Sequence, residues 1–181
     1  MRKRIVAGNW KMNTNLQEGI DLAKAVNNLV AEKAGKEIGV AIAPPFTHLS
    51  EIAKVIDTER ICLTAQNCAA EPKGAFTGEV APAMLASIGV KAVILGHSER
   101  RAYFNENSET LSKKIRLVLD NGLKPIFCCG EQLNERKAEK HFEVVKKQIS
   151  DVLFSLSNED FENVIVAYEP VWADRKSVVW E

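Results

Sequence analysis

Three polar stretches, far apart in the sequence, contain residue types that can move a proton next to a carbonyl group. Lys11 follows the first apolar run of the chain, His97 follows the fourth, and Glu169 follows the sixth. A carboxylate can act as a base, an imidazole can polarise a carbonyl, and an ammonium group can stabilise developing negative charge. Taken singly, Lys11 is equally typical of a solvated loop and His97 of a hydrogen-bonded strand end. Glu169 directly follows an apolar run, where partial loss of water would make it a stronger base.

Six short runs rich in Val and Ile predict the strands that position these residues. They are continuously apolar, which is typical of strands buried on both faces of a parallel sheet. They begin 23 to 39 residues apart, close to the length of a βα repeat. The predicted strands cover residues 4–8, 38–43, 61–65, 92–95, 125–129 and 164–168.

Amphipathic stretches between these runs predict helices. A period of 3.6 residues runs over 16–30, behind a possible capping box of Thr14 and Gln17. Pro82 fits the first turn of a helix over 82–88, and Asn121-Gly122 fits the end of a helix over 111–118. Two more helices are expected over 48–55 and 142–156, with His48 and His141 at the surface.

Alternating strands and helices leave two architectures open, a doubly wound sheet and a closed β/α barrel. In both, polar residues beyond the carboxyl ends of the strands meet at one edge. The first βα turn, Gly8-Asn9-Trp10-Lys11, contains no Gly-x-Gly-x-x-Gly, and no P-loop motif occurs. The absence of both nucleotide-binding devices slightly favours the barrel.

Composition excludes several classes of function. The 181 residues carry 24 basic and 24 acidic side chains and 46% apolar residues, which predicts one globular domain. Zero net charge provides no field for nucleic acid or an anionic membrane surface. No apolar run approaches the roughly 18 residues of a membrane span, and the basic N-terminus lacks a signal peptide's apolar region. Four cysteines without a Cys-x-x-Cys pair (Cys62, Cys68, Cys128, Cys129) indicate reduced thiols in a cytoplasmic protein, with Cys128 and Cys129 buried.

The segment 66–80 is too long for an ordinary βα loop of two to six residues. Gly74 and Gly78 flank the apolar pair Ala75-Phe76. Two interpretations stay open at this point: a flexible surface excursion, and a protruding arm whose Phe76 needs a pocket on a partner.

The strings around the three candidate residues carry a resemblance. Val6-Ala-Gly-Asn-Trp-Lys-Met-Asn13, Ile94-Leu-Gly-His-Ser-Glu-Arg-Arg101 and Val166-Ala-Tyr-Glu-Pro-Val-Trp-Ala173 resemble the active-site signatures of the triosephosphate isomerase family. The match runs in order from residue 4 to 173. It implies a parallel β/α (TIM) barrel and a cytoplasmic homodimer that interconverts dihydroxyacetone phosphate and D-glyceraldehyde 3-phosphate in glycolysis and gluconeogenesis. It also implies that neither a cofactor nor a metal is needed.

The same resemblance implies a role for each matching residue. Glu169 matches the base that moves a proton through an enediolate, and His97 matches a neutral imidazole that polarises the carbonyl, at the start of a helix. Asn9 and Lys11 match residues that hold the substrate and stabilise the developing oxyanion. Lys11 is also matched as a catalytic residue, as is Glu99, a carboxylate that orients this group. At the dimer interface, Thr77 matches the tip of an arm, while Gln66, Glu79 and Arg100 match its supporting contacts.

The end of the chain departs from this pattern. A barrel of this type has eight β/α units in about 250 residues, of which six are expected here. Residues 1–173 are predicted to form a partial barrel, and 174–181 a non-matching tail that resembles a truncation or a sequencing artefact. Lacking the family's lid and phosphate loops, the chain is expected to have little activity and two exposed edge strands. The alternatives are a non-catalytic dimerisation fragment and a barrel enzyme acting on another sugar phosphate.

Overall fold

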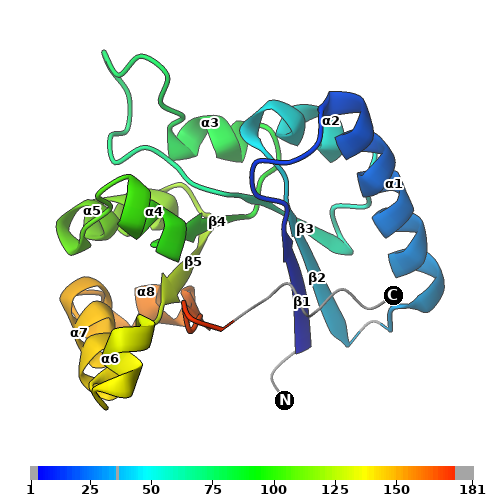
Figure 1. Ribbon diagram of the computed structural model, residues 1–181. Coiled ribbons are helices and arrows are strands. Elements are labelled where there is room, and N and C mark those ends of the chain that lie inside the picture. The colour runs from blue at the N-terminus through cyan, green and yellow to red at the C-terminus, as the bar shows by residue number, and fades with distance from the viewer. Residues whose placement is uncertain (1–3, 36, 174–181) are drawn as a thin grey trace.

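Six parallel strands form a single curled sheet in chain order. The computed structural model describes residues 4–35 and 37–173, so the predicted tail lies outside the described residues. Each strand pairs with the next in the sequence, giving the order β1-β2-β3-β4-β5-β6 (Figure 1). The strands are β1 (Arg4–Asn9), β2 (Ile38–Ala43), β3 (Ile61–Ala65), β4 (Ala92–Leu95), β5 (Lys124–Cys129) and β6 (Ile165–Tyr168). All six predicted strands are confirmed, with ends that differ by one residue at most.

Helices connect the strands and lie around the outside of the curl (Figure 1). This arrangement is an open, barrel-like β/α fold, and it excludes the doubly wound sheet, whose strand order reverses at a switch point. The helical elements are α1 (Leu16–Lys33), η1 (Phe46–His48), α2 (Leu49–Ala53), α3 (Pro82–Ser87), α4 (Ser98–Tyr103), α5 (Ser108–Asp120), α6 (Leu133–Lys137), α7 (His141–Leu153) and α8 (Asn158–Glu162).

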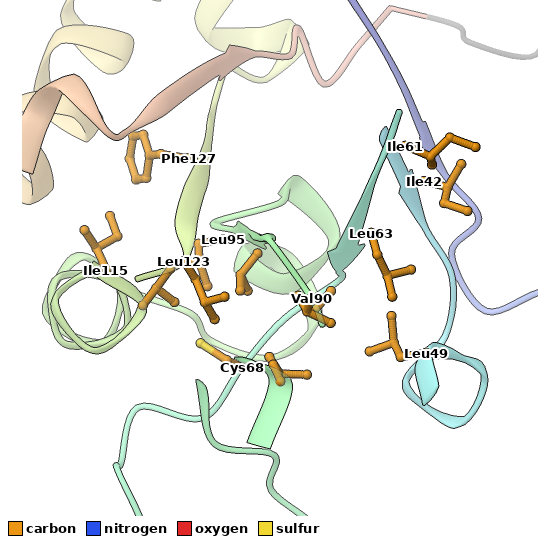
Figure 2. Packing of buried hydrophobic residues seen from close by; sticks show 14 of the residues in the cluster. Ile42, Leu49, Ile61, Leu63, Cys68, Val90, Leu95, Ile115, Leu123 and Phe127 are labelled. Atoms are coloured by element: carbon orange, nitrogen blue, oxygen red, sulfur yellow. The ribbon is translucent and has the colours of Figure 1, made fainter. Parts of the chain in front are cut away.

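The main core lies between the sheet and these outer helices. Phe127 and Leu95 point outward from β5 and β4 toward Ile115 of α5, and all three are fully buried (Figure 2). Their neighbours on the same strands face the concave side, where Ile94 and Cys128 belong to a second, much smaller apolar cluster. The alternation of a strand therefore sends successive side chains to the outer core and to the concave side in turn.

The prediction of strands buried on both faces is correct for the central strands and wrong for the outermost two. Most residues of β1 and β6 are exposed, because each strand forms an edge of the described sheet. The expectation of two exposed edge strands is therefore confirmed. Ile5, Val6 and Val166 are between 42% and 64% exposed on these strands, which is unusual for apolar residues in a parallel sheet.

Three local predictions need correction. The cap of α1 is Asn15, whose side chain accepts from the Glu18 backbone N–H while Glu18 accepts from the Asn15 N–H. Thr14 has a left-handed backbone (φ 71°) and makes no such box. The predicted helix over 142–156 ends at Leu153 and is followed by the short α8, and α6 was not foreseen. Phe142, expected on the apolar face, is 79% exposed.

His48 is buried, so its prediction as a surface residue is wrong. Its ring lies against the backbone of α1, where a Cβ on Gly19 would come within 2.2 Å of the His48 Cδ2 atom. One ring nitrogen, Nε2, donates to the carbonyl of Asn15 at 2.9 Å, and Nδ1 lies 2.8 Å from the Thr47 hydroxyl. These hydrogen bonds satisfy the polar atoms that burial would otherwise leave without partners.

Cys128 and Cys129 are buried as predicted, and the four cysteines are free thiols. Burial raises the pKa of Cys68 to about 12 and also raises that of Cys129, so both stay protonated at neutral pH. Among the described helices, none combines the length and the apolar character that crossing a bilayer requires. In residues 4–35 and 37–173, no three His, Cys, Asp or Glu side chains are grouped as metal ligands would be.

Candidate active site

His97 and Glu169 meet at the carboxyl ends of β4 and β6. The His97 Nε2 atom lies 3.4 Å from the Glu169 Oε1 atom, and the side chains are only 9% and 11% exposed. The backbone N–H of Glu99 donates to His97 Nδ1 at 3.3 Å, so Nδ1 carries no proton. This hydrogen bond selects the neutral tautomer with its proton on Nε2, the atom that faces Glu169. His97 is also the N-cap of α4, which confirms the predicted helix directly after it.

Glu99 links Lys11 to His97. Its Oε1 atom accepts from the Lys11 ammonium at 2.5 Å, and its Oε2 atom lies 3.5 Å from His97 Nδ1. Lys11 and Glu99 are both close to half exposed, so solvent weakens this ion pair and its main effect is to orient the lysine. Glu99 therefore holds Lys11 through its carboxylate and the His97 ring through its backbone N–H, while Nε2 of that ring faces Glu169.

The backbone at Lys11 has an uncommon conformation that neighbouring side chains hold in place. Lys11 has φ 54°, in the left-handed region where non-glycine residues are rare. The Asn9 side chain accepts from the Lys11 N–H at 3.0 Å. Gln66 donates to the carbonyls of Lys11 and Ala43, at 2.9 and 2.7 Å. Gln66, predicted at a dimer interface, thus holds the lysine loop within its own chain.

Two adjoining cavities contain these residues. The first, of about 480 Å³, lies in the concave side of the sheet and is lined by Asn9, His97 and Glu169 together with alanines and isoleucines of the strands. The second, of about 310 Å³, is lined by Asn9, Lys11, Gln66, His97, Glu99 and Arg100. Because Asn9 and His97 line both, Glu169 and Lys11 face neighbouring parts of one opening. The first cavity is large enough for a small metabolite.

Glu131 supports the segment that carries Glu169, and sequence reasoning missed it. The Glu131 side chain is fully buried and accepts from the Tyr168 hydroxyl at 2.9 and 3.1 Å and from the Trp172 indole at 2.9 Å. Burial alone would raise the pKa of Glu131, but these hydrogen bonds outweigh it and the pKa is lowered. A signal was available, since Glu131 lies just beyond the carboxyl end of β5.

Glu106 organises a second buried polar cluster, behind the loop that carries His97. Its carboxylate accepts from the Gly96 backbone N–H at 3.0 Å and from the Arg100 guanidinium at 3.3 Å, and it pairs with the Lys114 ammonium. Lys114 also donates to Asn67 at 2.8 Å. Burial alone would raise the pKa of Glu106. The Lys114 hydrogen bond and the charges of Lys114 and Arg100 outweigh burial and lower the pKa.

The segment 66–80 protrudes from the body of the protein between β3 and α3 (Figure 1). Phe76, Thr77 and Glu79 are all exposed, Phe76 to 47%. Gly74 and Gly78 have φ of 130° and 93°, which other residues rarely adopt, so glycine is required for the turns that form the tip. The segment is thus a protruding loop without helix or strand, with the apolar Phe76 exposed near its tip.

Comparisons with known proteins agree with this geometry. The family model described as triosephosphate isomerase matches residues 4–174. The chain belongs to the triosephosphate isomerase family. It is 57% identical to triosephosphate isomerase of Porphyromonas gingivalis over 175 residues, and 55% identical to that of Bacteroides fragilis over 173 residues. Both matches cover 96% of this chain and 68% of the relative, and that of Cytophaga hutchinsonii, at 46% identity, has the same coverage.

The observed fold agrees with membership of the triosephosphate isomerase family. The six described strands are consecutive β/α units of a TIM barrel, curled but open along β1 and β6. The family model extends one residue beyond the predicted match, to 174, and the following residues lie outside the described part of the chain.

The Glu106–Lys114 pair leads to a prediction about stability. We expect Glu106→Gln to lower the free energy of unfolding at neutral pH by about 3–5 kcal/mol, because it leaves Lys114 buried without its counter-charge. The folded-state pKa of Glu106 lies below its ordinary value. Its stabilising contribution is therefore complete above the ordinary carboxyl pKa and is lost as the pH falls through the lower, folded-state pKa. Urea unfolding of the parent chain at a series of acidic pH values should show that loss, and the variant should show a flatter acid limb.

Glu109→Gln is the control for this measurement. Glu109 pairs with Lys113 at the exposed start of α5, the helix that carries Lys114, and solvent screens this interaction. It should change stability far less than Glu106→Gln. Equal effects of the two variants would contradict the importance of the buried pair.

Proposed function

We propose that the site formed by Asn9, Lys11, His97, Glu99 and Glu169 carries out the family's reaction, the interconversion of dihydroxyacetone phosphate and D-glyceraldehyde 3-phosphate. The supporting observation is the 3.4 Å approach of the largely buried Glu169 carboxylate to the Nε2 atom of an imidazole whose Nδ1 accepts a backbone N–H, which leaves the proton of the ring on Nε2. A ketose and an aldose that differ by the position of one carbonyl interconvert by proton transfer between adjacent carbons. That reaction needs a base and a hydrogen-bond donor on one side of a small substrate.

Each residue then has a defined task. The Glu169 carboxylate takes a proton from the carbon next to the carbonyl, and the His97 Nε2–H donates a hydrogen bond to the carbonyl oxygen as negative charge develops there. In the resulting enediolate the hydroxyl proton passes to the former carbonyl oxygen, with His97 beside both oxygens, and Glu169 returns its proton to the neighbouring carbon as the new carbonyl forms. Lys11 supplies positive charge beside the oxyanion, and Glu99 holds the ammonium group in place. Asn9 orients both substrate and the Lys11 backbone.

Substrate and product have the same overall oxidation state, and the residues named above carry out the proton transfer. The proposal therefore includes neither a cofactor nor a metal. We further propose that the protein acts in the cytoplasm, in the glycolytic and gluconeogenic direction alike. Its four free cysteines support this location, because reducing compartments keep such thiols unpaired.

The exposed strand edges lead to a prediction about the 181-residue chain. We expect its turnover to be far below that of the full-length relatives, because β1 and β6 flank the first cavity and are open to solvent. Water in the site weakens the electrostatic interactions that stabilise the enediolate. A coupled assay of purified chain beside the Porphyromonas gingivalis enzyme measures this, and comparable turnover would contradict it.

The role of Glu169 is tested by Glu169→Gln, which keeps the size of the side chain but removes the base. We expect the rate of substrate proton exchange with D2O, followed by NMR, to fall by at least ~10²-fold relative to the parent chain. Proton exchange detects weak catalysis that a coupled assay would miss. Glu143→Gln, on the exposed side of α7, is the matched control and should leave the rate unchanged. A loss below tenfold would remove Glu169 from the mechanism.

We also propose that two copies of the chain form a dimer through the arm at 66–80. The second cavity offers a site for the partner's arm tip, because it opens beside Lys11, Gln66 and Arg100 and holds about 310 Å³. Around it, Met12, Phe104 and Phe46 are 96%, 64% and 38% exposed, which forms an apolar surface typical of an interface. Thr77 would lie at the tip that enters this cavity, with Phe76 and Glu79 beside it.

A charge and bulk change at the tip tests the dimer. We expect the parent chain to elute as a dimer in size-exclusion chromatography with light scattering, and Thr77→Arg to elute as a monomer. Lys73→Arg, which keeps the charge of an exposed residue next to the tip, should remain dimeric. A monomeric parent chain would contradict the proposal. Dimers without any proton exchange would instead support the alternative of a non-catalytic dimerisation fragment.

A further inference from the structure

At the carboxyl end of β5, the backbone of Gly130 touches the backbone of the proposed base. A Cβ at position 130 would lie 1.8 Å from the carbonyl oxygen of Glu169 and 2.6 Å from its carbonyl carbon. Gly130 does not have a left-handed backbone, so glycine is required here for space alone. One residue earlier, the Cys129 carbonyl accepts from the Glu169 N–H at 2.7 Å. The position of the Glu169 backbone therefore depends directly on the position of the Gly130 peptide groups.

Gln148 of α7 holds both sides of Gly130. Its side-chain oxygen accepts from the Gly130 N–H at 2.9 Å, and its side-chain nitrogen donates to the Gly130 carbonyl at 3.0 Å. Two hydrogen bonds from one planar amide fix the orientation of the glycine as well as its location. This matters at a glycine, because no side chain restricts its backbone.

The place of Gln148 in its helix is unusual for a polar residue. Val145, Ile149 and Val152 form the stripe of α7 that packs against the core, and Gln148 lies within that stripe, one turn from Val152. An apolar residue would be expected there. Gln148 also lines a third cavity, of about 250 Å³, together with Gly130, Arg101 and Glu169. The amide thus occupies a core-facing position beside the site, where a leucine would fit the helix pattern.

We propose that Gln148 is a positioning residue for Glu169, acting through Gly130. It orients the Gly130 peptide groups, Gly130 supports the Glu169 backbone, and the carboxylate is thereby kept 3.4 Å from His97 Nε2. The catalytic meaning of this arrangement rests on the proposed function of Glu169. The arrangement itself is a property of the free protein, so it is testable without turnover.

The test is native-state hydrogen exchange of the 15N-labelled 181-residue chain, comparing the parent with Gln148→Leu. Leucine keeps the approximate volume and removes both hydrogen bonds. We expect the amides of Gly130 and Glu169 to exchange at least about tenfold faster, while Leu63 in β3 keeps its rate. The His97 ring 15N signals should move as well, because Nε2 faces the Glu169 carboxylate. Lys146→Leu, on the exposed side of the same helix, is the matched control and should change none of these.

Gln148→Glu provides a second variant that retains polarity. A protonated carboxyl can accept from the Gly130 N–H and donate to its carbonyl, whereas a carboxylate can only accept. Relative to the parent at the same pH, exchange at Glu169 should be near normal in acid and accelerated at neutral pH. A residue with a merely structural role would not give this pH-dependent rescue.

Two outcomes would overturn the proposal. The first is equal acceleration at Leu63 and Glu169 in Gln148→Leu, which would indicate a general loss of stability. The second is unchanged exchange at Glu169 in both variants, which would show that the Gly130 contact does not transmit the effect. Failure of the proposed function gives a different result: Glu169→Gln would then leave proton exchange of the substrate intact, while the Gln148 variants still alter the Glu169 amide.

Discussion

The parallel pairing of β5 with β6 is the constraint on which the site depends. Its register places Cys129 opposite Tyr168, so the next residues along, Gly130 and Glu169, leave the sheet side by side. The other edge of β5 pairs with β4, and this pairing brings the loop that carries His97 to the same end of the sheet. A slip of one residue in either pairing would turn each following side chain to the opposite face. The 3.4 Å separation of imidazole and carboxylate is therefore a result of strand register.

Buried carboxylates secure the loops that follow these strands. Glu131 accepts hydrogen bonds from Tyr168, just before Glu169, and from Trp172, three residues after it. Glu106 accepts from the backbone at Gly96, just before His97. Both have pKa values lowered by their partners despite burial, so both remain charged at neutral pH. A charged acceptor makes stronger hydrogen bonds than a neutral one and costs more to leave unpaired. The candidate site is held in place by buried charged residues outside the His97–Glu169 pair, in a region where apolar packing alone would fix the loops less firmly.

The fold and the central residues were predictable because their signals are local. Six apolar runs at nearly regular spacing indicate parallel strands, and polar residues directly after them indicate the functional edge, which is how Lys11, His97 and Glu169 were found. The supporting residues depend on contacts between distant segments. Gln148 is 18 positions from Gly130, and His48 reaches the carbonyl of Asn15, 33 positions away. The periodicity of apolar residues does not indicate contacts between distant polar residues. The prediction of His48 at the surface is wrong for this reason, and Gln148 gives no signal in the sequence.

The two faces of the sheet also differ in what the sequence can tell. On the outer face, large side chains such as Phe127 and Leu95 fill the space between strand and helix, and their burial follows from hydrophobicity alone. On the concave face, alanines and isoleucines line a cavity of about 480 Å³. Apolar residues of this kind on a strand are compatible with close packing, with a cavity, or with a surface covered by another segment. The curvature of the sheet decides which of these environments the residues have, and that curvature depends on all of the strands together. The buried residues of the core can therefore be predicted one at a time from the sequence. The opening that contains the candidate site is determined only by the assembled fold.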